Sequence, residues 1–221
     1  MGVQVTTMTL VTTPTPRPLR RDAADNRAAL LAAARVVLNR DPDASLEAIA
    51  AQAGLSRRAV YGHFANRDEL LHELVHIGAE RVATALARVA HPDPVMRLAL
   101  IASQLWRELE SIRVMAVIAL RGPLKPYTDD SLRPLRASVL GAIRDGQRAE
   151  TIRPDIPADR LARLVEDAAL AVLEESMRSV LDNADGQRLI IATVLGTVGL
   201  GWRDVEAFIA AHPDLAWKDH D

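Results

Sequence analysis

One segment of the chain, Ser45–Phe64, gathers side chains with the chemistry of nucleic-acid binding. Arg57 and Arg58 are adjacent, and no acidic residue stands between Glu47 and Asp68. An arginine can donate two parallel hydrogen bonds to one guanine, and phosphate oxygens accept hydrogen bonds from arginine and tyrosine. The segment therefore has the composition of a surface that contacts DNA.

The same segment has the small and apolar residues of two short helices that meet at a steep angle. Ala50 leaves room where the helices would cross, and Gly54 tolerates the positive φ that the turn requires. The side chains that would hold the two helices together are Leu46, Ile49, Leu55, Val60 and Phe64. The outer face of the second helix is then left with Arg57, Arg58, Tyr61 and Gly62. This pattern predicts a helix-turn-helix whose second helix is exposed.

Phosphate contacts are expected beside that helix. Ser45 and Ser56 stand where the two helices begin, and a helix N-terminus offers backbone N–H groups to a phosphate. Tyr61, His63 and Arg67 also have side chains suited to phosphate. A second interpretation stays open on these residues alone, in which the segment only packs a helical corner and its arginines are solvated charges.

A second pattern, His72-Glu73-Leu74-Val75-His76, has the spacing of a zinc-binding helix. Two histidines one turn apart can share a zinc ion, with the glutamate as general base, so a zinc-dependent hydrolase is an alternative. The longer form of the motif needs a glycine and a third histidine where Ala79 and Val82 stand. An amphipathic helix with Leu71, Leu74 and Val75 inward explains the pattern more simply. We therefore expect no catalytic residue, no metal site and no cofactor.

The composition indicates a globular protein that keeps its positive charge local. The 221 residues are 49% hydrophobic and 25% charged, the formal net charge is -2, and cysteine is absent, which excludes disulfides and thiolate metal sites. Residues 1–18 are rich in threonine and proline and lack the pattern of a signal peptide. The longest apolar run, between Arg188 and Arg203, is too short for a membrane span. We expect a cytoplasmic protein without a membrane partner.

Helix is predicted for almost every segment. Alanine, leucine, arginine and glutamate are frequent, and no stretch alternates apolar and polar residues with a period of two. Asn66 with Glu69 three positions on resembles a capping box at the start of a long helix. We expect an all-α fold of about nine helices. Their approximate ranges are 25–38, 45–53, 56–64, 67–90, 95–110, 111–120, 131–149, 158–181 and 186–211.

From Leu55 to Leu71 the sequence resembles the recognition helix and the start of the next helix in the tetracycline-repressor (TetR) family. The residues that carry the resemblance are Tyr61-x-His63-Phe64 and then Asn66-Arg67-Asp68-Glu69-Leu70-Leu71, and the match extends over about residues 25–75. The resemblance implies that one set of residues faces bases: Arg57, Arg58, Ala59 and Gly62. It implies that a second set holds phosphates: Ser45, Tyr61, His63 and Arg67.

Three positions depart from the pattern of the family. Asp41-Pro42-Asp43 follows the first helix, where the family usually has a glycine and an aromatic residue. Arg67 stands in place of the commoner lysine, which keeps the charge. Gly62 stands where many members have a bulky side chain, so its contact with the bases is expected to be weak or water-mediated.

The resemblance implies a function and a division of the chain. The function is that of a sequence-specific DNA-binding transcriptional regulator, a repressor and not an enzyme, which a small-molecule ligand releases from a palindromic or near-palindromic operator. The expected domains are a disordered arm (1–21), a helix-turn-helix DNA-binding domain (22–70), a helical ligand-binding and dimerisation domain (71–212) and a tail (213–221). A helical small-molecule binder without DNA binding is the alternative. The arginines of the arm, Arg17, Arg20 and Arg21, either enter a minor groove or stay solvated.

The last two predicted helices carry apolar residues on more than one face, and such helices need cover on both sides. Members of the family pair through these two helices, so the resemblance implies a homodimer. A monomer that buries both helices is the alternative. Family members also usually hold a ligand between their fourth and eighth helices. Trp106, Met115, Tyr127 and Met177 fall in that region and are expected either to line an apolar pocket or to belong to the core.

Overall fold

The computed structural model describes residues 19–109, 112–121, 124–179 and 181–217. These residues form eleven α-helices and one short 3-10 helix, and no strand occurs among them, which confirms the all-α class. The helices are α1 (Leu19–Arg40), α2 (Leu46–Gln52), α3 (Arg57–His63), α4 (Arg67–Ala87), α5 (Pro94–Leu109), α6 (Arg113–Arg121), α7 (Pro126–Asp129), α8 (Arg133–Arg148), α9 (Ala158–Arg178), α10 (Asn183–Thr197), α11 (Trp202–Ala211) and η1 (Pro213–Leu215).

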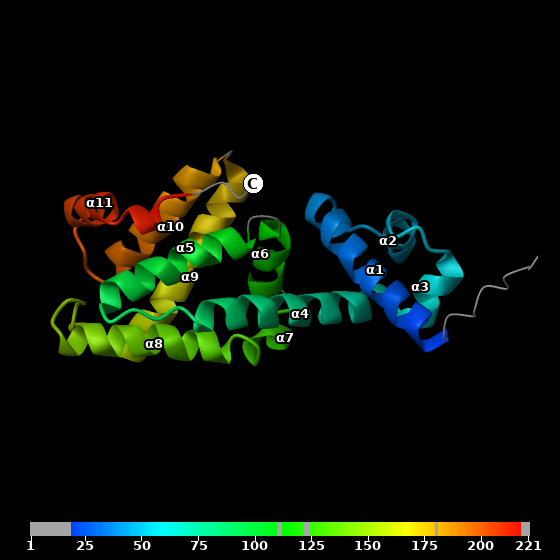
Figure 1. Ribbon diagram of the computed structural model, residues 1–221, viewed down its shortest axis with the longest axis horizontal. Coiled ribbons are helices and arrows are strands. Elements are labelled where there is room, and N and C mark those ends of the chain that lie inside the picture. Colours follow the sequence, from blue (N-terminus) through cyan, green and yellow to red (C-terminus); the bar gives the residue numbers. More distant parts are fainter. Residues whose placement is uncertain (1–18, 110–111, 122–123, 180, 218–221) are drawn as a thin grey trace, which may run out of the picture.

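The helices form a small unit and a large one (Figure 1). Helices α1, α2 and α3 lie together at one end, and we call them the head. Helices α5 to α11 form the rest, which we call the body. Helix α4 reaches from one to the other, packing on α1 and also on α5, α7 and α8. Most of the predicted arm lies outside the described residues, but α1 already begins at Leu19, inside the range assigned to it.

The helix count differs from the predicted nine at two places. A short helix, α7, forms at Pro126, where the sequence suggested only a loop. The long helix predicted over 186–211 is instead two helices, α10 and α11. It breaks at Gly199, whose φ of +112° lies in the region that glycine adopts without steric cost. The N–H of Leu200 donates to the carbonyl of Leu195 at 3.1 Å and closes the end of α10.

Side-chain caps fix where three helices begin. The hydroxyls of Ser45 and Ser56 each accept a hydrogen bond from a backbone N–H three residues on, both at 3.2 Å. Asn66 does the same for α4, accepting from the N–H of Glu69 at 2.9 Å, and the Glu69 carboxylate accepts from the N–H of Ala65 at 2.6 Å. The predicted capping of α4 is therefore confirmed, with Glu69 reaching one residue farther back than a standard capping box.

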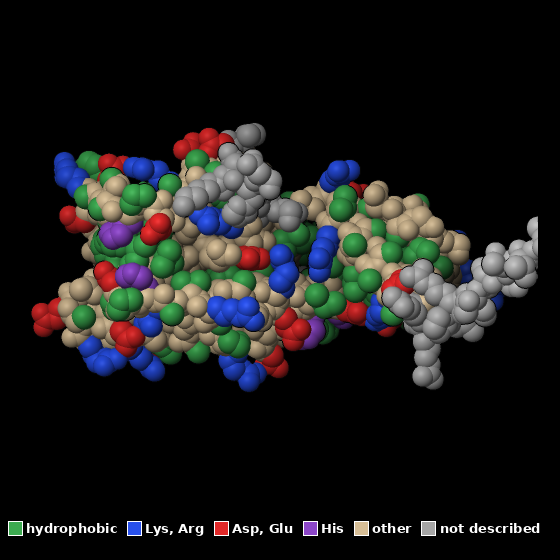
Figure 2. Space-filling model, viewed as in Figure 1, with side chains coloured by type: hydrophobic (Ala, Val, Ile, Leu, Met, Phe, Trp, Pro, Cys, Tyr) green, Lys and Arg blue, Asp and Glu red, His purple; other side chains and the backbone are tan. Residues whose placement is uncertain are grey.

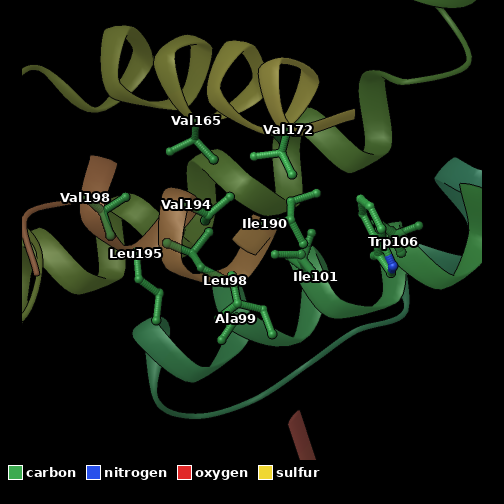
Figure 3. Close-up of a cluster of buried hydrophobic side chains, with 14 of the residues drawn as sticks. Leu98, Ala99, Ile101, Trp106, Val165, Val172, Ile190, Val194, Leu195 and Val198 are labelled. Carbon is green, nitrogen blue, oxygen red and sulfur yellow. The ribbon is translucent and has the colours of Figure 1, made fainter. Parts of the chain in front are cut away.

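Two clusters of buried apolar side chains hold the fold together. The first joins the head to the start of α4 and also includes Met115 and Ala119 of α6. The second fills the body, and Figure 3 shows Val165 and Val172 of α9 facing Ile190 and Val194 of α10. Because Met115 and Ala119 pack with residues of the head, the head is not closed off from the body.

The body is packed most closely where α5 meets α10. Trp106 of α5 is fully buried, and a Cβ atom placed on Gly186 of α10 would lie 1.8 Å from its ring. Glycine at position 186 therefore lets α10 approach the indole. The guanidinium of Arg113 covers the same indole, 4.0 Å from its centroid.

The segment predicted as a C-terminal tail packs onto the body as far as the structure describes it. Leu215 is buried, and its carbonyl accepts a hydrogen bond of 2.5 Å from the buried side chain of Gln187. Arg107 donates to the carbonyl of Ala216 at 3.1 Å. Across the described ranges, none of the helices has the length and apolar character of a membrane span.

Candidate DNA-binding surface and ligand cavity

Helices α2 and α3 form the predicted corner. Ala50 is buried at the crossing, and Gly54 in the turn has a φ of +68°. The N–H of Leu55 donates to the carbonyl of Ala50 at 2.9 Å, which closes the turn. Four of the apolar residues expected to hold the corner are buried, namely Leu46, Ile49, Val60 and Phe64. The fifth, Leu55, is half-buried.

The outer face of α3 is open to solvent. Arg57 and Arg58 are exposed, and the side chain of Arg57 keeps 75% of its accessible surface. Tyr61 and Gly62 are also exposed, whereas Ala59 is half-buried. Ser45 and Ser56 are exposed at the helix starts. Six of the residues predicted to face DNA are therefore accessible to solvent.

An acidic residue that sequence reasoning did not place on this surface lies among them. The carboxylate of Glu47 accepts a hydrogen bond from the Tyr61 hydroxyl at 3.0 Å and lies 3.3 Å from Nε of Arg57. The pKa of Glu47 is lowered by a hydrogen bond from its own backbone N–H, by the one from Tyr61, and by the charge of Arg57. The carboxylate of Glu47 is thus in contact with two side chains predicted to bind DNA, Arg57 and Tyr61.

Arg67 and His63 have partners within the head. Arg67 donates from Nε to the carbonyl of Ala44 at 2.9 Å and from Nη2 to the carbonyl of Pro42. His63 is half-buried, and its carbonyl accepts a hydrogen bond of 2.8 Å from Arg27. Two of the departures from the family pattern are therefore in contact, because the arginine at position 67 supports the turn that contains Pro42.

Arg27 of α1 is a positioning residue that no pattern in the sequence singled out. Its guanidinium is paired with the carboxylate of Glu73 on α4, with Nε–Oε1 at 3.0 Å, and donates to the carbonyl of His63 at the end of α3. It also lies over the ring of Phe64, 4.4 Å from the centroid. Arg27 therefore fixes the end of the exposed helix against α1 and α4.

The three polar side chains of the His-Glu-x-x-His pattern have separate partners. His72 stacks on Tyr127 of α7 with ring centroids 3.8 Å apart, and Glu73 pairs with Arg27. Nδ1 of His76 lies 3.1 Å from the hydroxyl of Ser131, which precedes α8. No group of three or more metal-ligand side chains occurs in the part of the chain that is described. Each of the three side chains therefore joins α4 to a neighbouring segment of the chain.

A cavity of about 330 Å³ lies in the body between α4, α5, α6, α8 and α9. Its walls are mostly leucine, valine, isoleucine and alanine side chains. Of the four residues predicted for a pocket, Met115 is in its wall. The other three lie elsewhere: Trp106 is buried in the core, Tyr127 is 46% exposed against His72, and Met177 is 44% exposed. These four residues were chosen because they fall in the region where family members usually hold a ligand, and the fold does not bring them to one surface.

Residues 30–74 match the family model of the bacterial regulatory proteins, tetR family. The chain is 27% identical over 197 residues to the HTH-type transcriptional repressor BepR of Brucella suis biovar 1 (strain 1330), covering 82% of this chain and 94% of that protein.

Solved structures share the fold. The regulator FadR from Bacillus subtilis, in complex with stearoyl-CoA, matches with a TM-score of 0.63 at 17% identity, over 78% of this chain and 97% of that one. The TetR-like regulator LfrR from Mycobacterium smegmatis, in complex with proflavine, matches with a TM-score of 0.62 at 18% identity, over 82% and 99%. The head therefore matches the tetR family in sequence, and the chain shares the fold of solved TetR-like transcriptional regulators.

Proposed function

We propose that this regulator is a repressor that binds a palindromic or near-palindromic operator as a homodimer and leaves it when a small molecule fills the body cavity. The observation that carries the proposal is the exposed face of α3, with Arg57 and Arg58 beside two capped helix N-termini. The similarity to BepR, which is a repressor, supports repression as the output.

On the DNA, one set of residues is proposed to meet bases in the major groove: Arg57, Arg58, Ala59 and Gly62. A second set is proposed to meet phosphates: Ser45, Ser56, Tyr61, His63 and Arg67. Ser45 and Ser56 act through the N–H groups of the helices that they cap. Arg57 and Tyr61 must exchange their contacts with Glu47 for contacts with DNA. Arg67 contributes its charge and keeps the neighbouring turn in place.

The dimer is proposed to form through α9 and α10. Leu164 of α9 is 42% exposed and Leu189 of α10 is 36% exposed, although the opposite faces of both helices are buried in the body. Gly196, exposed on α10, allows close approach of a second copy. We expect a dimer in sedimentation, and a monomer when both leucines are changed to aspartate.

Ligand release is proposed to act through α4. Leu74, Val82 and Leu86 of α4 line the cavity, and the same helix begins at Arg67 beside the DNA-binding corner. A ligand relieves repression only if it binds the arrangement that cannot hold DNA more tightly than the one that can. A tenfold loss of DNA affinity needs about 1.4 kcal/mol of differential binding. The small molecules in the FadR and LfrR structures support a ligand role for the fold.

The test is a mobility shift on the DNA beside the protein's own gene, with nonspecific competitor. Arg57→Ala and Arg58→Ala should each cost about 1–3 kcal/mol of binding to the operator and relax its specificity. Arg67→Ala should weaken binding to all sequences, and Arg144→Ala, an exposed arginine of α8, serves as the control. A wild-type protein with no specific shift at moderate salt contradicts the proposal and favours a ligand binder without DNA binding.

A further inference from the structure

The body cavity is long and almost entirely apolar. It is lined along α4 from Leu74 to Leu86, twelve positions or roughly 18 Å of helix. Thr128 is one polar residue in its wall, and that hydroxyl already donates to the carbonyl of Lys125 at 2.8 Å. A cavity of this form suits an extended hydrocarbon better than a flat or highly polar molecule.

Most of the charged side chains in the cavity wall neutralise one another. Arg81 pairs with Glu108 at 3.1 Å, and Arg163 pairs with Asp159 at 3.2 Å. Arg136 forms a two-pronged pair with Glu166, with Nη2–Oε1 at 2.7 Å and Nε–Oε2 at 2.9 Å, and the pKa of Arg136 is raised chiefly by these hydrogen bonds. These arginines are committed to carboxylates of the protein.

Arg35 is different. It lies on α1, in the head, and still forms part of the cavity wall. Within the described residues it makes no ion pair or hydrogen bond, and it is exposed. Because α1 packs on α4 and α6, this arginine stands at the end of the cavity nearest the head. Its guanidinium is free to receive an anion from a molecule whose apolar part lies between the helices.

We infer that the effector is an extended aliphatic molecule with one carboxylate end, and that Arg35 binds that carboxylate. The inference rests on the proposed function, because it names the class of ligand for the same cavity. The hydrocarbon fills the apolar channel along α4, and the anion pairs with a residue of the head. The ligand then connects head and body directly, so the charge that gives affinity also gives the coupling to DNA.

Calorimetry with laurate and lauryl alcohol, both kept below their aggregation limits, tests the anion site. Wild-type protein should bind laurate at least tenfold more tightly than Arg35→Ala does, whereas lauryl alcohol should bind both proteins equally. Arg35→Lys should recover part of the laurate affinity, since lysine keeps the charge but loses the two-pronged geometry. Arg40→Ala, on the same helix but outside the cavity wall, should bind laurate like the wild type.

The inference is overturned if laurate fails to bind, if laurate and its alcohol bind equally, or if Arg35→Ala leaves laurate affinity unchanged. Because Arg35 is exposed, the variant should melt at the wild-type temperature, which separates a lost contact from a lost fold.

DNA release is measured separately. Laurate should release the operator from the wild type, and lauryl alcohol should release less at equal occupancy. If the ligand-free protein binds no DNA while laurate affinity still depends on Arg35, the repressor proposal fails and the carboxylate site stands. If the protein binds and releases DNA with no role for Arg35, the repressor proposal stands and the carboxylate site fails.

Discussion

The head and the body use their apolar residues in opposite ways. In the head the apolar side chains are buried in one cluster, and the groups proposed to bind DNA lie outside it on α3. In the body the apolar interior itself contains the cavity, and the charges in the cavity wall are mostly paired. Substitutions in the head core should therefore change DNA binding only by moving the DNA-binding groups of α3. Substitutions in the cavity wall of the body should change ligand binding directly. On the face that Figure 2 shows, basic and acidic side chains are interspersed over the body without a large patch of one sign.

The largest expected effect tests how tightly the body is packed. Gly186→Ala places a Cβ 1.8 Å from the ring of Trp106, so the free energy of unfolding should fall by about 3 kcal/mol. Urea denaturation measures this loss. Gly141→Ala on α8 meets nothing within 4 Å and should be neutral or stabilising by up to about 1 kcal/mol. Equal stability of the two variants would contradict the close approach of α10 to Trp106.

The next effect tests whether the head is held by its interior contacts. Arg27→Ala leaves the Glu73 carboxylate and the His63 carbonyl without their donor, and should cost about 2 kcal/mol of stability. DNA affinity should fall although Arg27 is not proposed to touch DNA, while laurate affinity should stay at the wild-type level. Anisotropy on labelled operator and calorimetry read the two separately. A fall in both affinities would show that head and body do not divide their functions as described.

A smaller effect of opposite sign is expected on the DNA-binding surface. Glu47→Gln removes the charge that holds Arg57 and repels phosphate, so DNA affinity should rise about two- to fivefold. Glu206→Gln on α11, which removes one charge far from the head, is the matched control. If Glu47→Gln weakens binding more than its control does, then the carboxylate positions Arg57 for DNA and does not compete with it.

The smallest effect concerns the body in acid. A hydrogen bond from Arg97 lowers the pKa of Asp145, with a further contribution from the charge of Arg148. The folded protein therefore takes up this proton at a lower pH than the unfolded chain does. The stabilisation is complete above the ordinary aspartate pKa of about 3.9 and is lost as the pH falls through the lowered value. Asp145→Asn should reduce the slope of the melting temperature against pH in this range. A slope unchanged by Asp145→Asn would refute the linkage.

The corner of the head could be predicted from the sequence because its determinants are local. Ala50, Gly54 and the caps at Ser45 and Ser56 act within a few residues of themselves, so their types and spacing suffice. The cavity could not be predicted in this way. Its walls come from helices that are distant in sequence, and the residues chosen for size, such as Trp106, went to the core because Gly186 leaves room there.

The charged contacts of the head were missed for a related reason. Arg27 and Glu73 are 46 positions apart, and Glu47 and Tyr61 are 14 apart, so no helical spacing links either pair. The two departures from the family pattern at Pro42 and Arg67 were visible in the sequence, but only the folded chain shows that they are one contact.

The buried cluster shared by the head, α4 and α6 limits where the DNA-binding domains of two relatives can be exchanged. Met115 and Ala119 of α6 are packed with residues of α1 and with Leu74 of α4. The boundary between the head and the body is therefore a packed interface of side chains and not a loop. A chimera cut at residue 70 would join mismatched surfaces. A chimera that takes the first turns of α4 together with the facing residues of α6 from the same relative would keep both sides of that interface matched.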